Sequence, residues 1–215
     1  MSAHVRSKYC ACIVAQAAAK VDGRMVHTIL SKAEVAAFRA GPVDGLNIAS
    51  INHIVDSSGL LSVSLCGSAA SVAARLAKKP EDQKLRPQNP WHHPEYATTI
   101  SGFDGGIPAG KVSSTSCLLI SCSKATAIQS VDETHWLEWM SSPLDFAAAI
   151  ECVAKNLTVP CSLRSIELGA HPVMEGAAKS ICLLSPAVEV IHASTMKRGV
   201  AGAAHIKVCS APLHQ

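Results

Sequence analysis

The sequence predicts a mixed α/β fold, in which a small βαββαβ unit is followed by a longer region of alternating strands and helices. Two observations on the periodicity of apolar residues predict this fold. Apolar runs of strand and helix type follow one another in that order between residues 25 and 88, and the two types alternate again from residue 117 onward. The third observation is composition, because 48% of the 215 residues are hydrophobic and 16% are charged. Such a chain can bury an aliphatic core and is not expected to be disordered.

The first region is expected to contain four strands and two helices, preceded by a helix over residues 4–20. Strands are expected at 25–30, 46–52, 60–66 and 84–87, a capping box at Ser31–Glu34 opens a helix that ends at Gly41-Pro42, and Ser68 caps a second helix to about Lys78. The second and third strands can form a hairpin or flank a crossing strand. The order βαββαβ over residues 25–88 is that of a ferredoxin-like unit, a single sheet with both helices on one face.

The second region begins with a stretch rich in Pro and Gly, residues 89–115, which predicts a long functional loop or hinge. Beyond it, we expect a buried strand at 117–122, helices at 132–140, from Pro143 to 155–156 and from 172 to about 180, and strands at 164–168 and 188–192. This alternation is typical of an α/β layer.

Charge and hydropathy exclude two classes of partner. The formal net charge is +3, with no run of like charge that could follow a phosphate backbone, so nucleic acid is not an expected partner. The longest uncharged stretch, residues 57–74, contains six serines and two glycines, so no membrane-spanning segment is expected.

Cysteine usage predicts a reducing, cytoplasmic setting. The nine cysteines are an odd number, lie mostly in apolar runs and include no CxxC pair, so we interpret them as reduced thiols. The N-terminal segment imitates a secretory signal, with Arg6 and Lys8 before an apolar stretch. That stretch is mostly Ala and Cys without Leu, which suits an Ala-rich helix better than a signal peptide.

Six segments resemble, in order and spacing, the acyltransferase domain of polyketide and fatty-acid synthases, the malonyl-CoA:acyl carrier protein transacylase family. They are Gly23-Arg24-Met25 with Leu30-Ser31-Lys32-Ala33-Glu34-Val35 (GxM, LSxEEV); Ala49-Ser50-Ile51-Asn52 with Ser62-Val63-Ser64-Leu65-Cys66-Gly67 (AAxN, SVxxSG); Trp91-His92-His93-Pro94 (HSP); Trp136, Pro143 and Phe146 (YW, PVxF); Glu167-Leu168-Gly169-Ala170-His171-Pro172-Val173 (EVGPHPVL); and Ser194-Thr195-Met196-Lys197-Arg198-Gly199 (SxxRRG). The resemblance covers nearly the whole chain.

The resemblance implies an enzyme that moves an acyl group, malonyl in the first instance, from coenzyme A to the phosphopantetheine thiol of an acyl carrier protein. It implies a ferredoxin-like subdomain at 25–88, inserted in a larger α/β lobe formed by the helix of residues 1–24 and by residues 89–215. No tightly held cofactor is implied, because acyl-CoA is a substrate.

The sequence departs from the family at the nucleophile. The family's serine lies in a GHSxG motif on a strand-to-helix elbow, and no such motif occurs here. Arg6-Ser7-Lys8 resembles the RGR or RGK element of the helix after that elbow. We therefore expect about the first third of a full domain to be missing, and the chain alone to be inactive until that N-terminal segment, or neighbouring synthase domains, complete it.

Five candidate site residues follow from the resemblance. His92 matches the catalytic histidine, and an imidazole is suited to proton transfer at neutral pH. Arg6 is expected to bind the free carboxylate of a malonyl-type group, and Trp91, at a specificity position, to fill the space of an α-methyl group. His93 and Asn52 are expected to contribute to substrate binding, whereas His171 is expected to be structural. Each can instead be an ordinary loop, helix or packing residue.

Two other functional classes remain open from the sequence. A metal site would recruit His92, His93 and some cysteines, but no pair has ligand spacing such as CxxC or HxxxH, so no metal is expected. A non-catalytic lobe that binds a carrier protein or completes another polypeptide is the stronger alternative.

Overall fold

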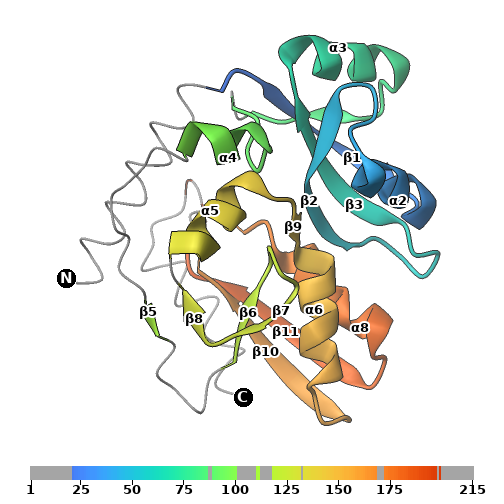
Figure 1. Cartoon of the computed structure of the whole chain (residues 1–215). Helices are drawn as coiled ribbons and strands as arrows, with labels where there is room; N and C mark the ends of the chain where they lie inside the picture. Colours follow the sequence, from blue (N-terminus) through green and yellow to red (C-terminus); the bar gives the residue numbers. More distant parts are fainter. Residues whose placement is uncertain are drawn as a thin grey trace.

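The computed structural model describes residues 21–86, 89–100, 110–111, 118–131, 133–168, 172–197 and 199. The helix expected over residues 4–20 lies outside these residues. Within them, the chain forms a mixed α/β fold, with one larger sheet and three strand pairs (Figure 1).

The larger sheet is built mainly from the first region of the chain. Its strands are β1 (Arg24–Leu30), β2 (Leu46–Ile54), β3 (Leu61–Gly67), β4 (Gln83–Lys84) and β9 (Leu144–Asp145), in the order β4-β1-β3-β2-β9. The first four strands pair antiparallel, and β9 pairs parallel with β2. The second and third strands are therefore a hairpin.

Both predicted caps of the first region are present. Helix α2 (Lys32–Ala40) starts at a capping box, in which Ser31 Oγ accepts the Glu34 N–H at 3.2 Å and Glu34 Oε2 accepts the Ser31 N–H at 2.8 Å. Helix α3 (Ala69–Lys78) starts at Ser68, whose Oγ accepts the Ser71 N–H at 3.0 Å.

The two helices cover the same face of this sheet. A single buried cluster contains side chains from α2, α3 and the strands, namely Val35, Phe38, Val72, Val26, Leu30, Leu46, Ile48, Ile51, Leu61, Val63 and Leu65. Because side chains alternate along a strand, the residues between these point to the opposite face. That face, here called the open face, carries Met25, His27, Ala49, Asn52, Ser62, Ser64 and Cys66.

The second region adds five helices and three strand pairs. The helices are α4 (Glu95–Ile100), α5 (Glu133–Ser141), α6 (Phe146–Lys155), α7 (Glu175–Lys179) and α8 (Ile181–Leu184). The pairs are β5 (Gly110–Lys111) with β8 (Ser130–Val131), β6 (Leu119–Ser121) with β7 (Thr126–Ile128), both antiparallel, and β10 (Cys161–Glu167) with β11 (Val188–Ser194), parallel.

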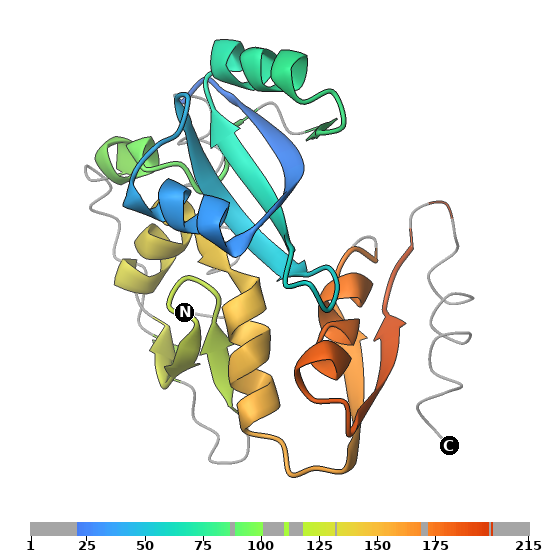
Figure 2. The same ribbon diagram turned by 90° about the vertical axis from the view of Figure 1, so that its right-hand side faces the viewer.

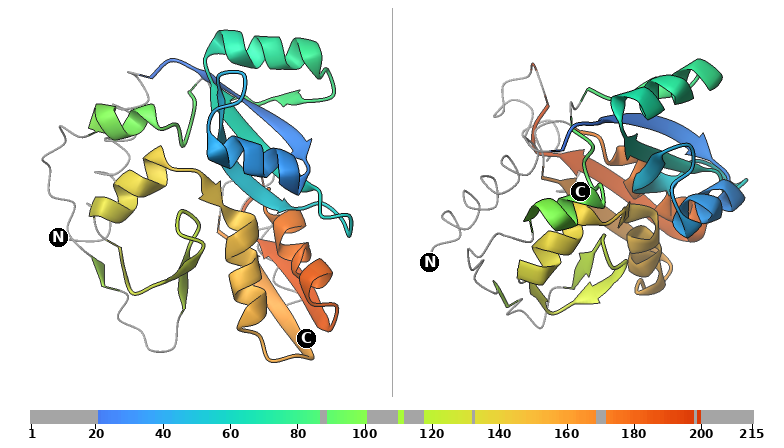
Figure 3. Two further views of the ribbon diagram at one scale, coloured as in Figure 1. Left: turned by 45° about the vertical axis from the view of Figure 1, so that its right-hand side comes forward. Right: turned by 45° about the horizontal axis from the view of Figure 1, so that its top comes forward.

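Helix α6 connects the larger sheet to the β10–β11 pair. β9 leads from α5 along the edge of β2 into α6, and α6 lies beside α7, α8 and the β10–β11 pair (Figures 2 and 3). Ile150 of α6, Ile181 of α8 and Val188 of β11 form a second buried hydrophobic cluster, separate from the one between the larger sheet and helices α2 and α3.

Three expectations for the second region are wrong in detail. The helix expected from Pro143 begins at Phe146, because Leu144–Asp145 pairs with β2 and Asp145 caps the helix by accepting the Ala148 N–H at 2.8 Å. The expected loop at 89–115 contains α4. In the strand expected at 117–122, of which residues 118–122 are described, Ser121 is buried, but Leu118 is 58% and Leu119 37% exposed. Among the described strands, β6 pairs with β7 in a two-stranded sheet.

The other strand and helix expectations are confirmed with shifted bounds. β10 begins three residues earlier than expected, the helix expected from 172 to about 180 is α7, and α8 beyond it was not expected. Among the residues that the structure describes, no helix combines the length and the hydropathy that crossing a bilayer requires.

Candidate functional site

His92 lies in a tight loop between β4 and α4, and its backbone φ is +59°. This left-handed conformation is uncommon for residues other than glycine, although histidine is among those that adopt it more often. The loop is closed by two backbone hydrogen bonds, from Trp91 N to Asn89 O at 3.1 Å and from Tyr96 N to His93 O at 3.0 Å.

One ring nitrogen of His92 forms a hydrogen bond with the backbone. Nδ1 lies 2.7 Å from the carbonyl oxygen of Trp139 in α5, and the two rings meet edge to face at 5.1 Å. Because a carbonyl only accepts, Nδ1 carries the proton and Nε2 of the neutral ring is left as a proton acceptor. Burial lowers the pKa of His92, and the Trp139 carbonyl partly opposes that shift. In its neutral form, the His92 ring is thus held by Nδ1 and can accept a proton at Nε2.

His93 is held by neighbouring polar groups. Its Nδ1 accepts the Glu95 N–H at 3.3 Å, and its Nε2 lies 3.2 Å from Asn47 Nδ2 on β2. Burial lowers the pKa of His93, partly opposed by the carboxylate of Glu95. Because Nδ1 accepts, the neutral ring carries its proton on Nε2, which faces the side-chain amide of Asn47, so His93 lies between the loop and the sheet.

Trp91 anchors the loop to the open face. Its ring packs against Met25, Ala49 and Cys66 and stacks on Tyr96 at 6.4 Å. Tyr96 is fully buried, and burial raises the pKa of its hydroxyl to about 12. The arrangement fixes where His92 stands above the sheet.

Asn52 lies farther along the open face, in a network of small polar side chains. Its Nδ2 lies 3.3 Å from both Ser62 Oγ and Ser64 Oγ, and its Oδ1 accepts the Ser50 hydroxyl at 2.8 Å. Ser62 Oγ is also 2.9 Å from His27 Nε2. The Asn52 amide is therefore fixed by the sheet itself.

This network lines a cavity of about 580 Å³ between the open face and α7. Its lining residues are His27, Asn52, His53, Ser62, Ser64, Gln83, Leu85, Val173, Met174 and Ala177. Leu85 of the lining packs against the same cluster of Met25, Ala49 and Cys66 as Trp91 does, so the cavity and the His92 loop lie on the same face of the sheet. The site thus has a polar floor on the sheet and an apolar wall opposite.

A buried carboxylate positions part of that wall. Glu167, at the end of β10, accepts the Val173 N–H at 3.0 Å and the Met174 N–H at 3.1 Å, and lies 3.4 Å from His192 Nε2. This is the EVGPHPVL-like turn, of which His171 lies outside the described residues. The glutamate of this turn therefore has a structural role.

The structure brings only some of the predicted site residues together. Trp91, His92 and His93 share one loop, Asn52 lines the cavity on the open face, and Arg6 lies outside the described residues. Sequence reasoning missed the Trp139 carbonyl, because a backbone group leaves no trace in a sequence. It also missed His27 and the two serines, although His27, Ser62 and Ser64 alternate with apolar residues and therefore had to share one face.

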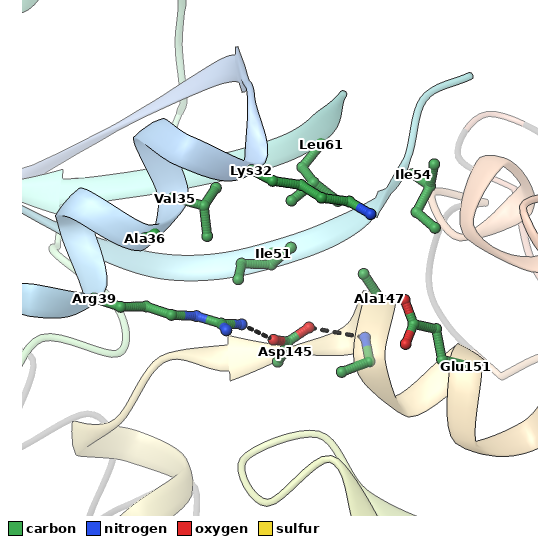
Figure 4. A pocket seen from close by; sticks show the side chains of 11 residues that line it. Lys32, Val35, Ala36, Arg39, Ile51, Ile54, Leu61, Asp145, Ala147 and Glu151 are labelled. Carbon is green, nitrogen blue, oxygen red and sulfur yellow. Dashed lines mark hydrogen bonds and ion pairs between the residues drawn. The ribbon is translucent and has the colours of Figure 1, made fainter. Parts of the chain in front are cut away.

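A second cavity lies on the helix-covered side of the sheet, between α2 and α6, with a volume of about 260 Å³ (Figure 4). Val35, Ile51 and Leu61 contribute to its apolar floor, and an ion pair between Arg39 and Asp145 closes one side. Within the described ranges, no group of three or more His, Cys, Asp or Glu side chains is arranged to hold a metal ion.

No protein-family model matches the sequence, and no curated protein matches it significantly. Solved structures do match. The acyltransferase domain from the second module of the salinomycin polyketide synthase superposes with a TM-score of 0.68 at 21% identity, over 97% of this chain and 50% of that one. A loading acyltransferase from the avermectin polyketide synthase gives 0.74 at 18% identity, over 98% and 65%.

A malonyl CoA-acyl carrier protein transacylase from Clostridium perfringens also matches, with a TM-score of 0.62 at 15% identity, over 97% of this chain and 63% of that one. The chain therefore has the fold of acyltransferase domains. It spans between half and two thirds of the length of these three structures.

Proposed function

We propose that this chain is the histidine-bearing part of an acyltransferase domain, which moves an acyl group from coenzyme A to an acyl carrier protein. The observation that carries the proposal is the state of His92: Nδ1 donates to the Trp139 carbonyl, and Nε2 is left to accept a proton. The fold shared with acyltransferase domains supports the same assignment.

The chemistry needs a serine that the 215 residues do not present on a GxSxG elbow. We propose that a complementary segment supplies it. His92 Nε2 then takes the serine proton as Oγ attacks the thioester carbonyl, and the thiol of coenzyme A leaves with that proton. In the second half of the reaction, the thiol of the carrier protein loses its proton to His92 and attacks the acyl-serine. The acyl group passes to the thiol, and the serine oxygen takes the proton back from His92.

The surface around β10 supports a complementary segment. β10 and β11 form a parallel pair, and parallel sheets are usually larger and covered on both faces. Ile166 and Leu168, at the end of β10, are 56% and 83% exposed. A further strand or helix from a partner would cover them.

We propose malonyl as the acyl group. The bulk of Trp91 beside the His92 loop supports it, because a large ring there leaves little space for an α-methyl group. Arg6 is proposed to bind the malonyl carboxylate. Preferential loading of methylmalonyl over malonyl from their coenzyme A thioesters would contradict this choice.

We also propose the organisation in which residues 25–88 are a ferredoxin-like subdomain, inserted between residues 1–24 and 89–215 of a larger lobe. The antiparallel order β4-β1-β3-β2, with α2 and α3 on one face, supports it. A cytoplasmic location is proposed, supported by the free thiols of all five cysteines that the structure describes. The reaction uses no tightly held cofactor, because the acyl group travels on thioesters.

The alternative is a non-catalytic lobe that binds a carrier protein or another partner. The absence of a GxSxG serine from the sequence favours it. One experiment separates the two: the chain is incubated with radiolabelled malonyl-CoA, alone and together with a GHSxG-bearing N-terminal acyltransferase segment. We expect labelling only of the complemented protein, abolished by His92→Ala and largely retained by His93→Ala. No labelling in any combination would favour the binding lobe.

A further inference from the structure

The cavity between α2 and α6 has an apolar floor and four charged side chains around it (Figure 4). Lys32 and Arg39 belong to α2, Asp145 caps α6, and Glu151 lies farther along α6. Two cations and two anions leave the lining without net charge. A ligand that carries only one sign of charge would therefore leave the opposite charge of the lining unmatched.

Two of the four charges already satisfy one another. The Arg39 guanidinium pairs with one carboxylate oxygen of Asp145, and the other oxygen accepts the Ala148 N–H at 2.8 Å. This pair closes one side of the cavity. A ligand inside would gain little from either group, so the other two charges decide what the cavity can hold.

Those two charges, on Lys32 and Glu151, have no partner among the residues that the structure describes. They reach the same part of the cavity from opposite walls, the ammonium from α2 and the carboxylate from α6 (Figure 4). Glu151 is half-buried, so its carboxylate has lost part of its hydration without gaining a countercharge. The cavity thus offers one free cation and one free anion to an occupant.

The turn between β2 and β3 restrains the Lys32 side chain. Gly59 in this turn has a φ of +79°, and a Cβ at its position would lie 3.3 Å from Lys32 Cε and 3.7 Å from Lys32 Nζ. The Lys32 side chain therefore lies against the turn, which restricts the directions open to its ammonium on that side.

The floor and the volume limit the rest of the ligand. Val35, Ile51 and Leu61 belong to the buried core and present apolar surface, which Ile54 and Ala147 extend. The volume of about 260 Å³ holds roughly nine groups, if each takes the ~30 Å³ that a water molecule takes in the liquid. This is the size of an amino acid with a branched aliphatic side chain, and coenzyme A is far too large for it.

We propose that this cavity binds a free hydrophobic α-amino acid of the size of leucine. Its carboxylate pairs with the Lys32 ammonium, its ammonium with the Glu151 carboxylate, and its side chain covers the apolar floor. A zwitterion matches both free charges at once, which a fatty acid or an amine cannot do. The floor belongs to the helix-covered face of the sheet, opposite the face that carries the His92 loop, so the inference goes beyond the proposed function and does not depend on it.

The test measures binding of L-leucine to the 215-residue chain by NMR, with ¹³C-labelled Val, Ile and Leu methyl groups as reporters. Isocaproate keeps the carboxylate and the apolar chain, isoamylamine keeps the ammonium and the apolar chain, and glycine keeps both charges without the chain. We expect saturable shifts of the Val35, Ile51 and Leu61 methyls with leucine, and binding weaker by roughly tenfold or more for each of the other three.

Variants connect the binding to the two free charges. Lys32→Met and Glu151→Gln each remove one charge with little change in size and should weaken leucine binding roughly tenfold. Ala36→Leu, at an exposed position of α2 that lines the cavity, should fill it and abolish binding. Lys155→Met, at the exposed end of α6 and outside the lining, is the matched control and should leave binding unchanged.

Several results would overturn the proposal: no binding of leucine at millimolar concentration, methyl shifts confined to other parts of the chain, or equal binding of isocaproate. Leucine binding that neither Lys32→Met nor Glu151→Gln weakens would overturn it as well. Circular dichroism checks that each variant folds, and the four-ligand series on the unchanged chain decides the question if one does not. Failure of acyl transfer in the complemented domain would refute the proposed function alone, because leucine binding needs neither His92 nor a serine nucleophile.

Discussion

At the scale of single residues, His92 combines an unusual backbone with a buried ring. Its φ of +59° is tolerated by Asn and Gly better than by other residues, and a β-branched substitution would add strain. His92→Asn is therefore the variant that removes the base with least disturbance of the loop. His92→Ala removes the Trp139 contact as well.

The pH dependence of acyl transfer should report the lowered pKa of His92. The neutral ring is the active form, so activity is lost as pH falls through this pKa, which burial places below the ordinary value of 6.5. We expect the acidic limb of kcat/KM for the complemented domain to have its midpoint below 6.5. A midpoint above that value would contradict the assignment of His92 as the base. His92→Asn is the control and should abolish the activity at every pH.

The thiol of Cys66 should be unreactive toward alkylating reagents in the folded chain. It is fully buried on the open face under Trp91, and burial raises the pKa of its thiol to about 12. We expect iodoacetamide near neutral pH to leave Cys66 unmodified until urea unfolds the protein, as read by peptide mass spectrometry. Cys152 and Cys161, which are partly exposed, are the internal controls. Modification of Cys66 at their rate would show that Trp91 does not cover it.

At the scale of elements, the capping box of α2 is expected to contribute to the free energy of unfolding. Ser31→Ala removes the oxygen that accepts the Glu34 N–H and should cost about 1 kcal/mol of the free energy of unfolding. Urea denaturation measures it, with Ser57→Ala, in an exposed turn, as the control. Equal stability of the two variants would mean that the box contributes nothing in solution.

The elements that local signals define are the ones that the sequence predicts well. β1, α2, β2, β3 and α3 follow from two-residue alternation, capping serines and turn residues that are all within a few positions of one another. β9 could not be found this way, because Leu144 becomes a strand residue only by pairing with Ser50, far away in the chain. Pro143 favours a helix start locally, and tertiary pairing overrides that preference.

The same distinction applies to the candidate site. The His92 position is recognisable from Trp91-His92-His93-Pro94, since a short motif carries it. Its partner in α5 is a carbonyl oxygen, which any residue could supply at position 139. The polar network around Asn52 was predictable in principle as a shared strand face, but the cavity also needs α7, whose position depends on how Glu167 holds the turn before it.

At the scale of the whole molecule, three partly buried histidines should control acid stability. Burial lowers the pKa of His53, His92 and His93 below 6.5, so between the lowered values and 6.5 the unfolded chain binds more protons than the folded one. The free energy of unfolding should therefore fall as pH decreases below about 6.5. Glu34 and Glu175, with pKa values lowered from 4.5, add to this loss only below 4.5.

Urea unfolding followed across this pH range tests the prediction. His93→Gln removes one of the three titrating groups and should make the stability curve less steep below 6.5, without changing its direction. Stability that is constant, or that increases, as the solution is acidified through this range would show that the three rings titrate as they do in the unfolded chain.

The pairing of β9 with β2 has a mechanical consequence for the molecule. Ser50 and Ile51 of β2 face Leu144 and Asp145 of β9, Asp145 N donates to the Cys122 carbonyl at 2.8 Å, and Arg39 of α2 pairs with the Asp145 carboxylate. Separating the two regions of the chain would break the β2–β9 ladder and the Arg39–Asp145 ion pair together, whereas the Asp145–Cys122 hydrogen bond attaches β9 to its own region. A change in the angle between the two regions therefore requires β9 to give up its pairing with β2 at the same time as Asp145 gives up Arg39.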